Sequence, residues 1–413
     1  MFEKFQNKMF PLLSKLGSIK VLVAVRDGVV LTTPLTIIGS VFLIIGNLPI
    51  EAWTNFIAPY SNSLNAVVNV TYGIIGVVAT IGIGYQLAKL LEIEPISNTV
   101  ITLVTFLLAT VTPEFGINVG QFGATGMFTG IVIAILTTYV CKFFIKNKIT
   151  IRMPDGVPPA IANSFVALIP AGAVITIVWV LRVLMGIDIN SIVQTLFSPL
   201  AYGLRTLPGF ILFSFTVSFL WLGGIHGNNV LSGIASPIFI TAIAENLIAF
   251  NNGQPAPHII NGVFWIMFCC IGGAGSTLGL VFAMIRSKSK MYRELGKLSL
   301  PAAIFCINEP VIFGTPIVFN PIMMIPFIAT PIILGTGTYF LMYFNIIGKA
   351  IFEMPWTMPT IIGPYLATNG SITAAIWSVC SIILSYLIYL PFFKVQERIQ
   401  LKIENGEVEE ASN

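Results

Sequence analysis

A chain of 413 residues is long enough for roughly two or three soluble domains, but 56% of it is hydrophobic and only 9% is charged. Its 21 basic and 17 acidic residues and two histidines are too few to cover the surface of a soluble protein, in which about a quarter of the residues are charged. The composition therefore predicts an all-α integral membrane protein, and the small net charge of +4 gives no basic region suited to nucleic acid.

Ten apolar windows are long enough to cross a bilayer, which takes roughly 17 to 25 residues. The windows lie near residues 29–48, 66–88, 98–112, 126–145, 162–182, 208–225, 232–250, 260–285, 320–345 and 372–393. Residues 1–28 precede them and place apolar side chains at helical spacing among four lysines. This pattern predicts a cytoplasmic amphipathic segment on an anionic membrane surface.

The lysines and arginines predict the side of the membrane on which each loop lies. If the N-terminus is cytoplasmic, 18 of the 21 basic residues fall in cytoplasmic segments, and only Arg182, Arg205 and Lys349 fall outside. Cytoplasmic loops of membrane proteins carry an excess of this kind. We therefore expect an even number of spans, with the N- and C-termini both cytoplasmic.

Two further apolar stretches contain too many prolines to be continuous spans. Residues 298–319 contain three prolines together with Asn308 and Glu309, and residues 351–366 contain three prolines within ten positions. An interior proline removes a backbone hydrogen bond and clashes with the preceding turn. Because irregular backbone survives at membrane depth only where protein or a cavity surrounds it, both stretches are predicted to be re-entrant hairpins.

An amphipathic segment at residues 188–207 divides the chain, since its apolar residues recur at helical spacing as in a helix lying flat on a membrane. Residues 29–187 then form a first half with five spans. Residues 208–393 form a second half with five spans and both hairpins, and residues 394–413 form a cytoplasmic tail.

Glu309 stands out among the acids because it lies inside an apolar segment. A carboxylate at membrane depth costs at least about 2.5 kcal/mol, so an interaction must offset that cost. A polar substrate group or a titratable site would do so. The alternative is a structural carboxylate that binds the hairpin backbone where Pro310 interrupts its hydrogen bonding. We favour the functional role, which is the default for an ionisable residue within a membrane.

His226 follows the sixth apolar window in the string FLWLGGIHGNNV, next to Asn228 and Asn229. Imidazole donates and accepts hydrogen bonds and titrates near neutral pH, so it could hold a hydroxyl group or help to move its proton. A structural histidine is the alternative, but the neighbouring glycines and asparagines favour function. We interpret the other histidine, His258, as an ordinary residue of an external loop.

Two tryptophans, Trp221 and Trp356, occupy positions where an aromatic face could meet a ligand. Carbohydrates pack their C–H faces on aromatic rings while amides and carboxylates bind their hydroxyls. The predicted carbohydrate site combines the polar residues of the two motifs with these rings: His226, Asn228, Asn229, Asn308, Glu309, Trp221 and Trp356. The alternative for each tryptophan is the aromatic belt at the membrane interface.

Several common chemistries have no motif in this chain. It has no G-x-x-x-x-G-K-[ST] loop for ATP, no H-E-x-x-H, and no cysteine or histidine spacing of the metal-binding kind. We expect neither a metal nor a cofactor. Transport energy must then come from an ion gradient or from another protein.

The segments described above resemble the membrane-embedded EIIC component of the bacterial phosphoenolpyruvate-dependent sugar phosphotransferase system, in its lactose/cellobiose/diacetylchitobiose branch. The resemblance rests on VRDGVVLTTPLTIIGSVFLIIGNLP at residues 25–49, WLGGIHGNNV at 221–230 and INEPVIFGTPIVFNP at 307–321. It covers essentially the whole chain. The last string, an I-x-E-P hairpin followed by FG-x-P-x-x-x-NP, is the most specific.

The resemblance implies a homodimer with ten spans per chain, in which the first half forms the dimer contact and the second half carries sugar across the bacterial cytoplasmic membrane. It also implies that the sugar's 6-hydroxyl attacks a phosphocysteine presented by a separate EIIB protein. Glu309 and His226 match the family residues beside that hydroxyl. Trp356, and with it Trp221, matches the tryptophans that pack on the sugar.

The chain has no EIIB-like cysteine motif of its own, so phosphotransferase activity requires phospho-EIIB, with EIIA upstream. Its tail ends in the acidic string ENGEVEEASN, which is too short to form a domain. We expect EIIB to dock on the basic loop from Arg286 to Lys297 and on other cytoplasmic loops. The alternative is that these charges serve only to orient the chain in the lipid membrane.

Two other classes of function remain open at this stage. A secondary transporter could couple sugar to protons through Glu309 and His226, and a membrane glycosyl or lipid transferase would need the paired acids that the chain lacks. The family resemblance favours transport coupled to phosphorylation. A long cavity with stacking tryptophans suits a β-linked disaccharide, in the order cellobiose, diacetylchitobiose, lactose.

Overall fold

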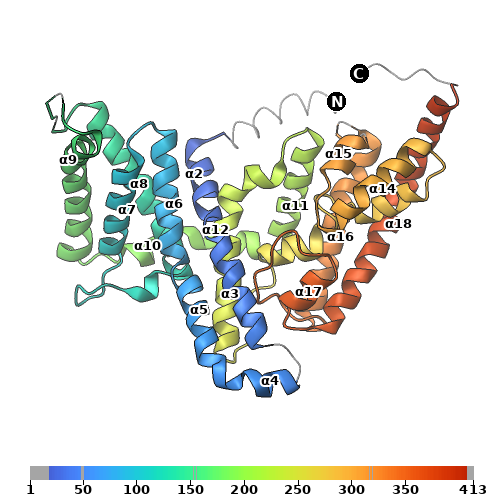
Figure 1. The fold of residues 1–413 in the computed structure, drawn as a ribbon, viewed down its shortest axis with the longest axis horizontal. Helices are drawn as coiled ribbons and strands as arrows, with labels where there is room; N and C mark the ends of the chain where they lie inside the picture. The colour runs from blue at the N-terminus through green and yellow to red at the C-terminus, as the bar shows by residue number, and fades with distance from the viewer. Residues whose placement is uncertain are drawn as a thin grey trace.

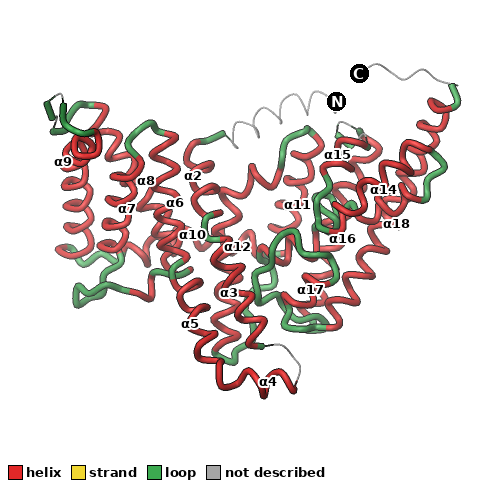
Figure 2. Tube along the Cα trace, viewed as in Figure 1, coloured by secondary structure: helices red, strands yellow, loops and turns green. Residues whose placement is uncertain are grey.

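The computed structural model describes residues 18–47, 51–151, 153–154, 156–315, 317–318 and 320–406, apart from the side chains of residues 51, 54, 159 and 160. Throughout this part of the chain the regular structure is helical, and no strand occurs in it (Figures 1 and 2). The predicted all-α class is confirmed. Most of the predicted surface helix, residues 1–17, and the tip of the acidic tail, residues 407–413, lie outside the described residues.

The helices carry the labels of Figure 1. In chain order they are α2 (Lys20–Val30), α3 (Thr33–Gly46), α4 (Glu51–Ile57), η1 (Ala58–Tyr60), α5 (Ser61–Gly73), α6 (Ile75–Leu90), α7 (Pro95–Ala109), η2 (Val119–Gln121), η3 (Ala124–Gly126), α8 (Met127–Lys146), α9 (Pro159–Trp179), η4 (Val180–Leu184), α10 (Ile189–Arg205), α11 (Leu207–Leu222), α12 (Gly227–Asn251), η5 (Phe264–Cys269), α13 (Leu278–Ile285), α14 (Lys290–Ile304), α15 (Glu309–Gly314), α16 (Pro321–Tyr343), α17 (Ile362–Ala367) and α18 (Ile372–Glu404).

The described chain contains 7 helices, some built of consecutive segments, that are long and apolar enough to cross a membrane. The number rises to 8 if α10 and α11, which meet at 77°, form one broken span, and α7 is apolar but shorter. The protein is therefore a multi-pass membrane protein. Seven of the ten predicted windows coincide with long helices, two more with α7 and α11, and the total of ten spans stays a prediction.

The first span begins earlier than predicted. It runs from Lys20 to Gly46, so residues 20–28, which we expected in the surface helix, belong to it. The window excluded them because Arg26 and Asp27 are charged. These two side chains form an ion pair of 2.7 Å between Arg26 Nε and Asp27 Oδ1, which lowers the cost of placing both in the span.

The predicted span at 260–285 is wrong as a continuous helix. It consists of η5, a glycine turn and α13, and the turn places Gly272, Gly273 and Gly275 at φ of +71°, +102° and +73°. Helix cannot continue through such backbone. Nearly every residue of this stretch is buried, so its apolar character reflects packing inside the protein rather than exposure to lipid.

The two proline-rich stretches take different forms. In the first, α14 and α15 are joined by a tight turn that contains Cys306 at φ +62°, and α14 begins at Lys290, before the predicted segment. In the second, an irregular loop leads into α17. Its ends are tied together, because the backbone N–H groups of Ile351 and Phe352 both donate to Ala367 O, at 2.8 and 3.2 Å.

Helix α10 occupies the residues predicted for the amphipathic divider. Asp188 caps its first turn by accepting the Ser191 N–H at 3.0 Å. Near the same end, Thr129 of α8 donates to Asn190 Oδ1 at 2.5 Å, and Gln194 donates to Thr125 O at 2.6 Å. These bonds join the start of α10 to the first half of the chain, while α11 continues from its other end.

Candidate functional site

Glu309 is the first residue of α15 and follows the turn after α14. Its side chain is exposed, and within the part of the chain that the structure describes it forms no hydrogen bond or ion pair. The structural alternative required this carboxylate to bind the hairpin backbone. Its free oxygens instead leave it available as an acceptor for a ligand.

Asn308, the residue before Glu309, anchors the start of α15 to the glycine turn. Its side chain is buried, and its Nδ2 donates to Ala274 O at 2.6 Å and to Thr277 Oγ1 at 2.8 Å. Gly273 passes so close that a Cβ there would lie 2.4 Å from Asn308 Cγ. The glycine turn therefore allows the carboxamide to lock the hairpin against the core, and both amide hydrogens of Asn308 are committed to the fold.

His226 caps the start of α12. Its Nδ1 accepts the backbone N–H of Asn229 at 3.3 Å, so in the neutral ring the hydrogen is carried by Nε2. The ring also packs on Trp221, with 4.3 Å between ring centroids and 46° between planes. These two contacts fix the ring and make Nε2–H the hydrogen-bond donor that the site can offer.

The carboxylate of Glu309 lies close enough to the imidazole of His226 for its charge to act on the ring, although 83 residues separate them in sequence. Arg26 of α2 also acts on His226, and the sequence analysis missed it by treating it only as a cytoplasmic charge. Its position in the VRDG string at the start of the first matched segment was the available signal.

The asparagines of the glycine-rich motif differ in their surroundings. Asn228 is half-buried, and its Oδ1 accepts the indole N–H of Trp265 at 3.1 Å. Asn229 has an exposed side chain, while its backbone serves His226. Trp265 was not predicted, because a tryptophan inside an apolar window carries no sign that its N–H orients a polar motif.

The two candidate tryptophans are not equivalent. Trp356 lies in the loop before α17 and is 55% exposed, so its ring has a free face. Trp221 is 4% exposed, packs on His226, and has an indole N–H with no hydrogen-bond partner among the described residues. Trp356 suits a stacking platform, whereas Trp221 supports the imidazole.

A second acid lies near this region and was missed. Glu353 is half-buried in the proline-rich loop, three residues before Trp356, and contacts Tyr72 of α5. Tyr72 in turn shares a 2.7 Å hydrogen bond with Ser40 of α3. Glu309 is therefore not alone in apolar surroundings, and the adjacency of Glu353 to the P-W-T-x-P motif was the available signal.

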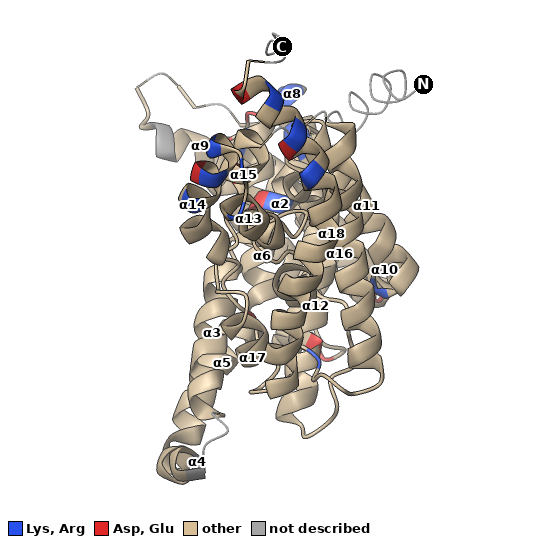
Figure 3. Ribbon diagram, turned by 90° about the vertical axis from the view of Figure 1, so that its right-hand side faces the viewer, with Lys and Arg blue, Asp and Glu red and all other residues tan. Residues whose placement is uncertain are grey.

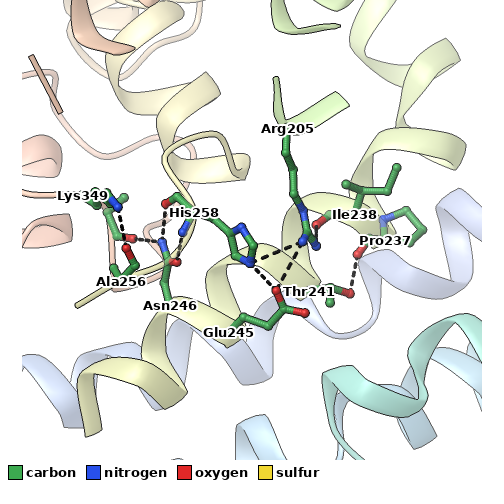
Figure 4. Close-up of polar contacts among 10 residues, drawn as sticks. Arg205, Pro237, Ile238, Thr241, Glu245, Asn246, Ala256, His258 and Lys349 are labelled. Atoms are coloured by element: carbon green, nitrogen blue, oxygen red, sulfur yellow. Dashed lines mark hydrogen bonds and ion pairs between the residues drawn. The ribbon is translucent and has the colours of Figure 1, made fainter. Parts of the chain in front are cut away.

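His258 takes no part in this site. Its Nε2 pairs with Glu245 Oε2, and Arg205 Nη1 approaches the same oxygen at 3.3 Å (Figure 4). Asn246 fixes the backbone alongside, because its Nδ2 donates to His258 O at 2.7 Å and to Ala350 O at 2.8 Å, while its Oδ1 accepts His258 N–H at 2.8 Å. We call these four residues (Arg205, Glu245, Asn246 and His258) the polar cluster.

Known proteins match the chain over most of its length. The family model described as phosphotransferase system, EIIC, matches residues 26–331. The lichenan permease IIC component of Bacillus subtilis (strain 168) is 39% identical, over 97% of this chain and 94% of its own length. The cellobiose-specific EIIC component of Geobacillus stearothermophilus is 36% identical, over 95% and 93%.

A solved structure has the same fold. It is the crystal structure of the transporter ChbC, the IIC component from the N,N'-diacetylchitobiose-specific phosphotransferase system. The TM-score is 0.94 at 35% sequence identity, covering 98% of this chain and 99% of ChbC. Together with the sequence matches, this similarity confirms the resemblance drawn from the three motifs.

Proposed function

The chain belongs to the EIIC family of the sugar phosphotransferase system, and on that premise we propose that it carries a β-linked disaccharide across the cytoplasmic membrane and presents the 6-hydroxyl for phosphorylation by phospho-EIIB. Relatives are named for cellobiose, oligo-β-mannoside and lactose. These names support a β-linked disaccharide as the class of substrate. Within this class we propose a sugar of the cellobiose type.

The observation that carries this proposal is the pairing of a free acceptor with an oriented donor. Glu309 has an unpaired carboxylate, and His226 offers Nε2–H because Nδ1 is already occupied. A sugar hydroxyl between them can donate to Glu309 while accepting from His226. A hydroxyl becomes a useful nucleophile only when its proton is removed or shared, so this is the arrangement that phosphoryl transfer needs.

The transfer step then balances with residues of this chain and one partner. The sugar O6 attacks the phosphorus of the phosphocysteine, the O–P bond forms, and the S–P bond breaks to release the EIIB thiolate. The hydroxyl proton passes to Glu309, which later returns it to water. His226 holds O6 in line through its Nε2–H, so Glu309 is the catalytic base and His226 positions the nucleophile.

Sugar recognition is assigned to the rings and amides around this pair. We assign Trp356 as the stacking platform because its ring is free, and Asn229 as a hydroxyl-binding residue because its side chain is exposed. Asn228 and Trp221 belong to the same motif, and we assign them to the wall of the sugar site. Asn308 retains only its Oδ1 for a ligand, so we assign it chiefly to positioning Glu309.

The orientation we propose places both termini in the cytoplasm. In support, α2 begins and α18 ends on the same side of the molecule (Figure 1), and most of the lysines and arginines lie at that end of the helices (Figure 3). We further propose that the first half forms a homodimer in the lipid membrane. EIIB then approaches from the cytoplasm towards the basic segment from Arg286 to Lys297, with EIIA upstream of it. This segment was predicted to be a loop, but from Lys290 onward it is the start of α14.

One experiment separates this function from proton-coupled transport, which the comparisons do not support. Purified protein in sealed vesicles is given sugar and phospho-EIIB after the proton gradient has been collapsed. We expect sugar phosphate to accumulate at an undiminished rate. If accumulation stops with the gradient, the protein is instead a secondary transporter that uses Glu309 and His226 for protons.

A further inference from the structure

Helix α14 exposes an apolar stripe that nothing in the described chain covers. Met291, Leu298 and Phe305 are spaced seven residues apart, so they lie on one side of the helix, and they are 41%, 74% and 49% exposed. A different side of the helix, about 100° around its axis, is buried through Tyr292 and Ser299. The stripe is therefore an exposed apolar surface on which another molecule can pack.

Basic side chains border this stripe at its start. Arg286, Lys288 and Lys290 are exposed and have no ion-pair partner within 4.0 Å in the part of the chain that the structure describes. The exposed acid nearby, Glu294, is already paired, since Lys297 Nζ lies 2.9 Å from its Oε1. That hydrogen bond from Lys297 lowers the pKa of Glu294 below its usual range. The surface therefore presents free positive charge and little free negative charge.

Two carboxylates of α18 hold the surface in shape. Glu397 accepts Ser287 Oγ at 2.6 Å and the Lys288 N–H at 2.7 Å. Glu404 accepts Ser289 Oγ at 2.6 Å and the Lys290 N–H at 3.1 Å. Both acids are engaged in hydrogen bonds within the chain, Glu397 as a buried side chain and Glu404 as an exposed one. The start of α14 is therefore fixed without a ligand, which lowers the cost of binding one.

The position of α18 places the start of α14 beyond the lipid. A helix of 33 residues is about 50 Å long, whereas the hydrocarbon core of a bilayer is about 30 Å thick. Part of α18 therefore lies outside the core, and we infer that it is the last turns, because they carry the charged residues Lys394, Glu397, Arg398, Lys402 and Glu404. Helix α14 begins beside that end of α18 and runs back towards α16 (Figure 1). We infer from this position that its first turns lie outside the core as well.

The same helix leads directly to the reactive carboxylate. Glu309 follows Phe305 by four residues, and α15 packs on α14 so closely that a Cβ at Gly314 would lie 2.8 Å from Leu295 Cδ1. A protein seated on the stripe would thus lie next to Glu309. A phosphocysteine carries a nearly dianionic group, which is complementary to the free cations at the rim.

We propose that the α14 stripe, Met291, Leu298 and Phe305, with the cations Lys288 and Lys290, is the docking surface for the protein that presents the phosphocysteine. The inference rests on the proposed function and specifies the surface on which EIIB binds. The apolar stripe supplies the anchor, and the basic rim steers the phosphorylated form. The carboxylates of α18 hold residues 287–290 in one conformation, so little ordering is needed on binding.

The test uses the full-length protein in nanodiscs of uncharged lipid and a purified phospho-EIIB of the cellobiose type as the probe. Leu298→Asp should raise the KM for phospho-EIIB about tenfold, the effect of losing one interface anchor, while sugar affinity and kcat stay unchanged. The double variant Lys288→Gln, Lys290→Gln should raise the same KM and weaken its dependence on salt.

Control variants lie at the end of α8 and in the loop that follows it, where Lys146, Lys148 and Ile149 are also exposed. Ile149→Asp and the double change Lys146→Gln, Lys148→Gln should leave the KM unchanged. Unaltered sugar affinity in Leu298→Asp shows that the variant is folded. If the α14 variants bind phospho-EIIB as the wild type does, the docking surface lies elsewhere.

Two other outcomes would also be decisive. If the α14 variants change behaviour only in vesicles of anionic lipid, the stripe contacts the membrane and the docking inference is wrong. If the wild type transfers no phosphate at all, the proposed function fails, and equilibrium binding of phospho-EIIB to wild type and variants then tests the surface by itself.

Discussion

Glu309 and His226, which we propose as the reactive pair, and the polar cluster use the same residue types in opposite ways. In the polar cluster, Glu245 is paired with both His258 and Arg205, and the neighbouring Asn246 uses both ends of its amide (Figure 4). At the reactive pair, Glu309 has no partner in the described chain, and His226 keeps Nε2–H free. Polar groups that are paired with one another stabilise a fold, whereas an unpaired acceptor and an unpaired donor are available to a ligand.

The largest expected effect is the loss of transfer in Glu309→Gln. The amide keeps the shape of the side chain but cannot take the hydroxyl proton, so we expect phosphorylation by phospho-EIIB to fall by about 10²- to 10⁴-fold. Single-turnover rates at saturating sugar measure this. Glu245→Gln is the matched control and should transfer at the wild-type rate; equal losses in the two variants would abolish the distinction between the two acids.

The two histidines provide a second contrast. His226→Ala removes a hydrogen bond to an oxygen that gains negative charge, which is worth about 1.5–3 kcal/mol, or roughly 10- to 100-fold in transfer rate. His258→Ala should leave the rate of the folded protein unchanged. His226→Gln, which retains an N–H donor, should recover part of the activity. Wild-type transfer by His226→Ala would remove its positioning role.

Substitutions of the two tryptophans distinguish sugar binding, assigned to Trp356, from packing against His226, assigned to Trp221. Trp356→Ala should weaken sugar binding about tenfold, because an exposed ring of this kind contributes about 1–1.5 kcal/mol through stacking. Titration calorimetry with cellobiose measures the change. Trp221→Phe retains an aromatic surface for His226 and should alter sugar affinity less than Trp356→Ala. The reverse order would assign the sugar platform to Trp221.

The smallest expected effect concerns stability. Glu245→Gln leaves Arg205 without its charged partner, and because the pair is only partly buried we expect unfolding in detergent to become easier by about 1 kcal/mol. Glu309→Gln, with no partner to lose, should leave the unfolding midpoint unchanged. A lower midpoint for Glu309→Gln would mean that its carboxylate supports the fold after all.

Local signals in the sequence were sufficient for some features and insufficient for others. The prolines around Glu309 predicted a broken segment, because proline acts on the backbone of its own turn. The stretch 260–285 was mistaken for a span, although its cluster of glycines signalled a turn, because hydrophobicity does not distinguish burial in protein from exposure to lipid. For Arg26 and Glu353 the sequence motifs marked only the position, because the surroundings of each, like the partners of Glu245, depend on contacts between distant segments.

The central claim is that Glu309 accepts the 6-hydroxyl of the sugar, and binding of a deoxy analogue tests it most directly. The wild type should bind cellobiose about tenfold or more tightly than the analogue that lacks the 6-hydroxyl of the reacting ring, because a hydrogen bond to a charged group contributes about 1.5–3 kcal/mol. In Glu309→Gln, most of that difference should disappear. If the variant discriminates between the two sugars as strongly as the wild type, Glu309 does not hold the hydroxyl and the proposed mechanism is wrong.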